Sequence, residues 1–248
     1  MSQLKKFTFN IYSSICLDNQ IDLPSNENIQ NTFRNFKSNQ IISCVDYFLE
    51  ATEGQCLIYS YLYTLKEYNK ITNNFSGGLF ECVREISLFD ERPFEHDFFL
   101  RIAQSFPLIE ELTLINQKPR KNKQCTKSKD DEQDFSIIKY SHLYYLNLCE
   151  AHEDYIEQFL DHTKTYLPNN MDLVADHELL KKVTHNFKRN TTRINCSKIN
   201  YLYSCTLYSL PKHLKHYFLH IRVLICLYNL KVLAFQKKNI IELSFDII

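Results

Sequence analysis

Glycine is scarce in this sequence. The 248 residues include only Gly54, Gly77 and Gly78, and no tryptophan. Glycines at these positions cannot form G-x-G-x-x-G or the P-loop G-x-x-x-x-G-K-[ST], the two usual backbone cradles for phosphate groups. They cannot form G-x-S-x-G either, the turn that presents the serine of many hydrolases. The sequence therefore carries none of these common nucleotide-binding or hydrolase motifs.

An excess of charge of one sign is also absent. The 29 basic residues balance the 29 acidic ones, so the formal net charge is +0. No overall field would attract nucleic acid or an anionic membrane, and we expect neither as a partner.

The most apolar stretch, residues 216–235, is interrupted by His220, Arg222 and Lys231. These interruptions argue against a membrane-spanning helix and favour a buried helix or strand.

The cysteines show no metal-ligand spacing. No C-x-x-C pair occurs, so we expect no zinc site and no cofactor. Buried free thiols in a reducing compartment are the expected state. The first residues, MSQLKKFTFN, lack an apolar signal core, so the predicted location is the cytoplasm, with the nucleus as a second candidate. The nine cysteines are Cys16, Cys44, Cys56, Cys82, Cys125, Cys149, Cys196, Cys205 and Cys226.

One short apolar pattern recurs along the chain. In L-x-x-L-x-L, the opening of a leucine-rich repeat, the first, fourth and sixth positions are apolar. Because 44% of the residues are apolar, roughly 20 chance matches are expected, so the context must support the pattern. VREISL and IEELTL begin 26 residues apart, within the usual repeat length of about 20 to 29 residues. The matches considered are LKKFTF (4–9), VREISL (83–88), IEELTL (109–114) and LYYLNL (143–148).

Helical patterns alternate with these predicted strands. After VREISL, Asp90 can cap a helix, Pro93 suits its first turn, Phe98 and Ile102 lie on one face, and Pro107 ends it. HEDYIEQFLDH and DHELLKKVTHNF show similar apolar stripes. LYYLNL follows IEELTL by 34 residues, and the surplus is a polar tract that predicts a surface insertion. Strand and helix therefore alternate from about residue 82 to 187.

These patterns predict one repeat-type domain over residues 1–248. Residues 82–187 hold clear strand–helix units, with a disordered insertion at about 118–134. Residues 1–81 are predicted as degenerate repeats, with a helix in NENIQNTFRNF and strands in QIISCVDYFLE and QCLIYSYLY. Residues 188–248 are predicted as further repeats or a cap, with a strand at TRINC (192–196).

The predicted fold class is α/β. Each unit shows one apolar face that it cannot bury alone, and stacking neighbouring units buries it. We expect a leucine-rich-repeat-like solenoid with parallel strands on the concave face and helices outside. The side chains predicted to share its interior are Ile86, Leu88, Leu112, Leu114, Leu146 and Leu148.

The chain resembles the repeat region of F-box proteins, and a divergent invertebrate group of them in particular. The resemblance rests on residues 83–119, on CLIYSYLYTLKEYNKITNNFSGGLF and on HNFKRNTTRINCSKINYLYSC, about half of the chain. It implies the target-binding half of a ubiquitin-ligase adaptor. The helical F-box that docks such adaptors on the ligase scaffold is not recognisable, and the ninth repeat position holds Glu91, Gln117 and Ala151 where Asn or Cys is usual.

Alternation along a strand predicts which side chains face the concave side. The third, fifth and seventh positions of each unit should form columns about 4.8 Å apart, suited to a peptide or loop that bears a basic residue. An alternative is that small polar residues simply suit an exposed strand. Cys149 would end the LYYLNL strand in the column of Phe89 and Ile115. The predicted protein-binding residues are Lys6, Thr8, Glu85, Ser87, Phe89, Glu111, Thr113, Ile115, Tyr145 and Asn147.

The charged cluster DERPFEHD (90–97) is the most enzyme-like feature. Its acids and His96 could supply acid–base pairs, but carboxylates at a helix start also stabilise the helix dipole. HEDYI has Ile156 where H-E-x-x-H needs a second histidine, so it predicts no metal site. We therefore predict a protein-binding adaptor module with no catalytic residue. The alternatives are a degenerate α/β hydrolase-like enzyme and a non-functional, truncated member of the family.

Overall fold

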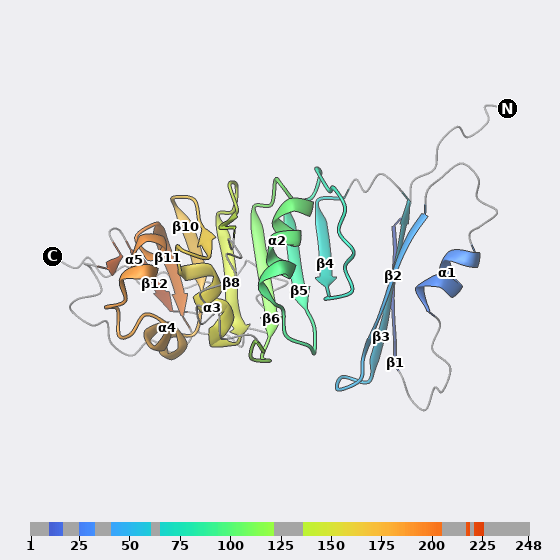
Figure 1. Ribbon diagram of the computed structural model, residues 1–248, viewed down its shortest axis with the longest axis horizontal. Helices are drawn as coiled ribbons and strands as arrows, with labels where there is room; N and C mark the ends of the chain where they lie inside the picture. Colours follow the sequence, from blue (N-terminus) through green and yellow to red (C-terminus); the bar gives the residue numbers. More distant parts are fainter. Residues whose placement is uncertain are drawn as a thin grey trace, which may run out of the picture. The chain divides into compact units, whose positions relative to one another are not determined.

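The computed structural model describes residues 10–16, 25–32, 41–60, 65–121, 136–204, 217–218 and 221–225 (Figure 1). The chain divides into two compact units, where the sequence analysis predicted one domain. The first unit comprises residues up to Leu65 together with Thr72–Ser76, and the second comprises Lys66–Ile71 and the chain from Gly77. Among the described residues, no helix is long and apolar enough to span a membrane.

The first unit is an antiparallel sheet with one helix. Its elements are β1 (Asn10–Cys16), α1 (Asn26–Thr32), β2 (Ile41–Phe48) and β3 (Glu53–Ser60). The strand order is β1-β3-β2, and both pairs are antiparallel. The strands predicted in QIISCVDYFLE and QCLIYSYLY are confirmed. The prediction that they are degenerate repeats is wrong, because the four-residue connection Leu49–Thr52 is too short for a parallel crossover and makes a hairpin.

A buried carboxylate joins the Thr72–Ser76 segment to this sheet. Asp46 on β2 is 4% exposed. Its Oδ1 accepts hydrogen bonds from Thr72 Oγ1 at 2.8 Å and from Asn74 Nδ2 at 2.6 Å. A buried carboxylate is costly unless hydrogen bonds satisfy it, so these donors explain why the segment packs with the first unit.

The second unit contains a seven-stranded sheet in which every pair of neighbours is parallel. The order is β12-β11-β10-β8-β6-β5-β4, which follows the chain except that β7 and β9 form a separate two-stranded sheet. The strands are β4 (Glu67–Ile71), β5 (Glu85–Phe89), β6 (Glu111–Asn116), β7 (Ile138–Lys139), β8 (Tyr145–Ala151), β9 (Thr165–Tyr166), β10 (Met171–Val174), β11 (Ile199–Ser204) and β12 (Arg222–Ile225).

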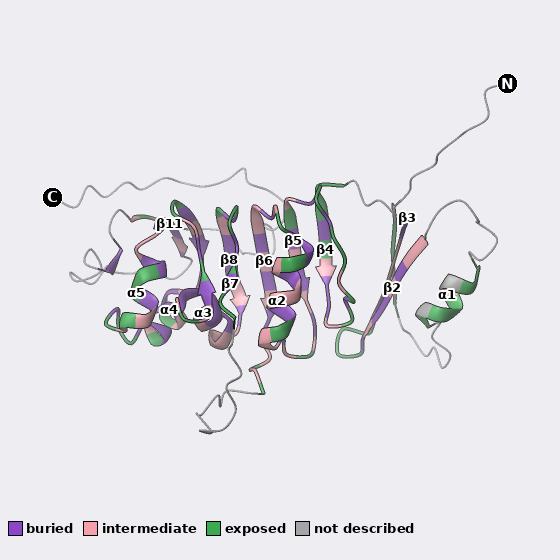
Figure 2. Cartoon of the chain, turned by 45° about the horizontal axis from the view of Figure 1, so that its top comes forward, coloured by how far each residue is buried: buried purple, intermediate pink, exposed green. Residues whose placement is uncertain are grey.

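The helices of the second unit lie on one side of its large sheet (Figures 1 and 2). This placement has a simple cause. When successive strands are neighbours and each crossover is right-handed, every crossover returns over the same face. The described helices are α2 (His96–Ser105), α3 (Glu153–Leu160), α4 (His177–Val183) and α5 (Asn190–Cys196).

The core lies between this sheet and the helices. The six side chains predicted to share the interior are all 1% exposed or less, so that prediction is confirmed. Parallel pairing places Ile86, Leu112 and Leu146 in one line, and Leu173 and Leu202 extend it. The helices contribute aromatic rings, and in Figure 2 buried residues run along the central strands.

The predicted start of α2 is wrong. The helix begins at His96, and Glu95 before it makes no side-chain capping bond. Asp90 is buried instead, and its Oδ1 accepts from the backbone N–H of Arg92 at 2.8 Å. An aspartate that bonds two residues ahead stabilises a turn, so Asp90 ends β5 and does not cap α2.

Two further predictions need correction or limits. Residues 118–121 of the predicted insertion are described, and the N–H of Arg120 donates to Asp154 Oδ2 at 2.9 Å. The rest of it, residues 122–134, lies outside the described residues.

TRINC is not a strand but belongs to α5, which buries Thr192, Asn195 and Cys196. These positions have helical spacing, but two of them are polar, so hydrophobic periodicity did not reveal the helix.

We expect Leu112→Ala to lower the free energy of unfolding by about 2–5 kcal/mol, because it leaves a cavity in the middle of the shared interior. Thr113→Ala on the opposite face of β6 should cost less than about 1 kcal/mol. Urea unfolding followed by circular dichroism measures both. Equal costs for the two variants would contradict this assignment of faces.

Candidate functional site: the helix-free face of the sheet

The face of the large sheet opposite the helices presents ordered rows of side chains. The first row lies near the amino ends of the strands and is acidic at one end. Its three neighbouring carboxylates are those of Glu67, Glu85 and Glu111. In register order, the first row is Glu67, Glu85, Glu111, Tyr145, Asp172, Tyr201 and Arg222.

The second row is smaller and partly engaged in structural bonds. Ser87, Thr113 and Asn147 lie side by side on β5, β6 and β8, as predicted. Ser87 Oγ accepts from the N–H of Lys70 at 2.8 Å and donates to Asn69 Oδ1 at 3.2 Å, so it fixes the irregular edge strand β4. Asn147 is only 9% exposed. Thr113 is the best-placed residue of this row to contact a partner.

The third row changes at β8. Phe89 pairs with Ile115, as predicted, and both are half-buried. A register shift in β8 then places Glu150, and not Cys149, opposite Ile115. The extra residue reverses which side chains face outward, which is the usual effect of a bulge. The prediction for Cys149 is therefore wrong, because one-residue irregularities leave no mark in an apolar pattern.

Most of the predicted binding residues thus come together on one face. Glu85 is exposed, and Glu111 and Tyr145 are half-buried beside it. Lys6 and Thr8 lie outside the described residues. The sequence analysis missed the part of the face formed by β10, β11 and β12. The signal was there in INYLYS, where Ile199 and Leu202 have the repeat spacing, but its sixth position is the polar Ser204.

Tyr144 is a further residue that the pattern did not reveal. It directly precedes β8 and is 43% exposed. Its hydroxyl donates a hydrogen bond to Glu111 Oε1. This bond, together with burial and the charges of Glu111, Glu110 and Glu85, raises the pKa of Tyr144. The hydroxyl therefore lies in a negative field formed by several carboxylates.

Nearby ionic groups shape this field. Arg84 Nε lies 3.4 Å from Glu110 Oε1, so one of the local acids has a cationic partner. Burial raises the pKa of Asp172, further along the first row. The acidic character is strongest where β5 and β6 begin.

Two cations of the chain already lie against aromatic rings on this face. The guanidinium of Arg222 lies 5.7 Å from the ring centroid of Tyr201, and its Nη1 donates to the hydroxyl of the same residue at 3.1 Å. Lys70 Nζ lies 6.0 Å from the ring centroid of Phe89. Rings in these rows therefore accept cations, as electron-rich aromatic faces do.

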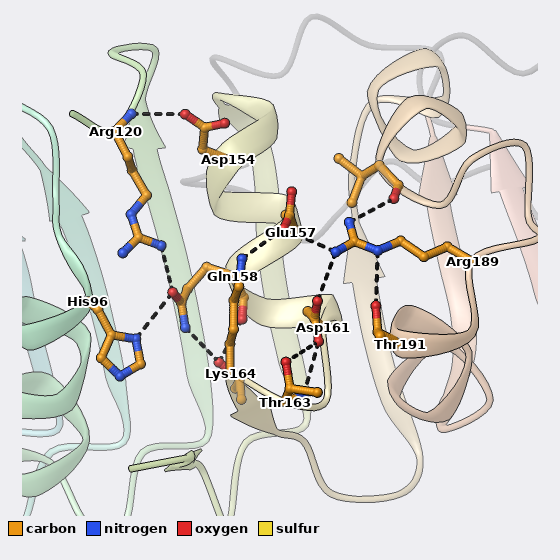
Figure 3. A network of polar contacts seen from close by, with 12 residues as sticks. His96, Arg120, Asp154, Glu157, Gln158, Asp161, Thr163, Lys164, Arg189 and Thr191 are labelled. Carbon is orange, nitrogen blue, oxygen red and sulfur yellow. Dashed lines mark hydrogen bonds and ion pairs between the residues drawn. The ribbon is translucent and has the colours of Figure 1, made fainter. Parts of the chain in front are cut away.

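An extended polar network lies on the other side, in the helix layer (Figure 3). Arg189 Nη2 donates to Asp161 Oδ2 at 2.9 Å and to Glu157 Oε1 at 3.2 Å. Lys164 Nζ donates to the same Glu157 oxygen at 2.7 Å. Burial opposes ionisation of Glu157, but bonds from Lys164 and Arg189 outweigh it and lower its pKa. This network joins α3 to the segment before α5.

A second node of the network joins α2 to α3. Gln158 is fully buried, and its Oε1 accepts from Arg120 Nη1 at 2.7 Å and lies 3.4 Å from His96 Nδ1. Its Nε2 donates to Thr165 Oγ1 at 3.1 Å. His96, one of the groups that looked enzyme-like in sequence, thus contacts the neighbouring helix α3. Within the described ranges, no group of three or more His, Cys, Asp or Glu side chains could hold a metal ion.

Comparisons with known protein families, with curated proteins and with solved structures find no match to this chain.

Arg189→Ala should lower the free energy of unfolding by about 3–5 kcal/mol at neutral pH, because it leaves the buried Asp161 carboxylate without its ion pair. Because the pKa of Glu157 is lowered in the folded chain, its carboxylate stabilises the fold fully at a pH above the ordinary pKa of glutamate. That stabilisation is lost as the pH falls through the lowered pKa. The difference from wild type should therefore shrink at low pH. Urea titrations at neutral pH and at a pH below the lowered pKa of Glu157 test this. Lys188→Ala, at the exposed neighbouring position, is the control. A difference independent of pH would contradict the ion-pair assignment.

Glu111→Gln should bring the pKa of Tyr144 back toward its ordinary value of about 10, since the hydrogen bond to a carboxylate is the largest cause of the rise. An NMR titration of the labelled tyrosine Cζ carbon measures this. Glu178→Gln, which removes a charge from α4, serves as the control. Identical midpoints in the wild type and Glu111→Gln would show that Tyr144 does not bond to Glu111.

Proposed function

We propose that this chain is a protein-binding module whose helix-free sheet face recognises a partner protein. The observation that carries the proposal is the set of side-chain rows that run in register across neighbouring parallel strands. All described helices of the unit lie on the opposite side, so the rows form one broad surface (Figure 1). Extended segments and loops bind to such surfaces through alternating side chains.

The composition of the face supports a protein partner. Interface centres are rich in aromatic residues, and the rows contain Tyr145, Tyr201 and Phe89 beside small polar residues. Tyr144 adds an exposed ring at the acidic end. Rings of this kind supply much of the binding energy of protein interfaces because they bury a large area with few rotatable bonds.

We further propose that the second unit is a leucine-rich-repeat-like solenoid of the F-box type. The 26-residue spacing of VREISL and IEELTL supports this, as does the order of the strands along the sheet. On this proposal, the chain provides the target-recognition half of a ubiquitin-ligase adaptor, and an element supplied in trans would connect it to the ligase scaffold. The target is then a protein of the cytoplasm or the nucleus.

Peptides selected by phage display against the full chain test the proposed surface. We expect the double variant Glu85→Lys/Glu111→Lys, and separately Thr113→Trp, to weaken binding of the selected peptides at least about tenfold, through charge reversal and steric blocking. Isothermal titration calorimetry with synthetic copies measures the dissociation constants.

Asp97→Lys/Glu178→Lys is the matched control, because it makes the same charge change on exposed positions of α2 and α4. It should leave the dissociation constants unchanged. Selected peptides that bind the face variants as tightly as the wild type would overturn the proposed surface. Circular dichroism of each variant excludes unfolding as the cause of a loss.

A further inference from the structure

Strand β1 forms an open edge of the sheet in the first unit. Among the residues that the structure describes, it pairs with β3 alone, and the strand order places it at one end of the sheet. An edge strand presents a row of backbone N–H and C=O groups to which a further strand can bind. Ile11 is 50% exposed and Tyr12 is 49% exposed, so this strand is accessible from solvent.

This edge lacks the features that usually prevent edge-to-edge pairing, which are charged residues, prolines and bulges. The sequence of β1 is NIYSSIC, with no charge and no proline, and its 7 residues pair with β3 without a shift of register. β4, an edge strand of the large sheet, does carry such features, namely Glu67, Lys70 and an irregular register. The contrast indicates that β1 is suited to accept another strand.

Two side chains of β1 reach back across its own sheet. The hydroxyl of Tyr12 donates to Gln55 Oε1 at 3.1 Å. Ser14 Oγ donates to Glu53 Oε1 at 2.7 Å. Both acceptors belong to β3, so these side chains are held on the inner side of the strand and leave its outer side accessible.

The sequence of β1 is complementary to itself. When two copies run antiparallel about a twofold axis at Ser13, residues equally far from Ser13 on either side stand opposite each other. No pair then opposes like charges, which would destabilise two neighbouring strands. A second, identical strand therefore fits this edge. The pairs are Asn10 with Cys16, Ile11 with Ile15, Tyr12 with Ser14, and Ser13 with Ser13.

We propose that this chain forms a twofold dimer in which the β1 strands of two copies pair antiparallel. Contact between identical strands closes at two copies, whereas β1 against β2 of another copy would give an open-ended row. The two edges also differ, because α1 lies against β2 (Figure 1). The dimer does not depend on the proposed target-binding face, and it joins two such faces in one assembly.

The expected dimer is weak. One pair of edge strands buries less than about 1,200 Å², which is typical of transient contacts, so we expect a dissociation constant on the order of 10 µM. Sedimentation velocity of the full chain in a reducing buffer, from about 1 to 100 µM, should show the weight-average sedimentation coefficient rise from the monomer toward the dimer.

Variants at the twofold axis locate the contact. Ser13 is exposed and stands opposite itself in the dimer. Ser13→Lys and Ser13→Glu should each weaken the dimer about fivefold, because like charges then meet at the axis. An equimolar mixture of the two variants should associate about as tightly as the wild type, since Lys then stands opposite Glu. A folding defect would not be rescued by mixing.

Ser136→Lys is the matched control, because it makes the same change at an exposed position of the second unit. It should leave the dissociation constant unchanged. A wild-type chain that stays monomeric at about 100 µM overturns the proposal and leaves the edge to a strand of a different protein. A dimer that Ser13→Lys does not weaken, or a mixture no tighter than either variant alone, also overturns it.

Discussion

The second unit depends on a single constraint, which is the parallel pairing of each strand with the next one along the chain. Ile86, Leu112 and Leu146 can share one interior only because their strands align in register. With right-handed crossovers, the same alignment sends each described helix to the same face. The opposite face is then left to polar and aromatic rows. The core and the candidate binding surface are therefore two consequences of one register.

The helix layer keeps this register by polar contacts as well as by apolar packing. Arg189, Glu157 and Asp161 tie α3 to the segment before α5, and Gln158 ties α3 to α2. Buried charges of this kind favour one spacing of the helices over others, because a shift would leave Asp161 without its partner. The ion pairs of Arg189 with Glu157 and Asp161 thus serve to hold the architecture of the helix layer.

The first unit follows a different rule. Its strands β2 and β3 are joined by a short hairpin, so they pair antiparallel and do not continue the parallel sheet. β4 nevertheless joins the parallel sheet, although it lies within the region predicted as degenerate repeats. Thr72 and Asn74, which follow that strand, donate hydrogen bonds to Asp46 of the first unit. The chain therefore passes from one unit to the other and back within a few residues.

The sequence by itself determined the central strands, their buried side chains and the outward position of Glu85, Glu111 and Thr113. It could do so because alternation with period two and the 26-residue spacing are local signals. Only the tertiary structure decided that Asp90 ends a strand, that β8 shifts its register and that Tyr144 bonds to Glu111. The first is a local polar turn, the second is a one-residue irregularity and the third joins residues far apart in the sequence, and none of them leaves a periodic apolar trace.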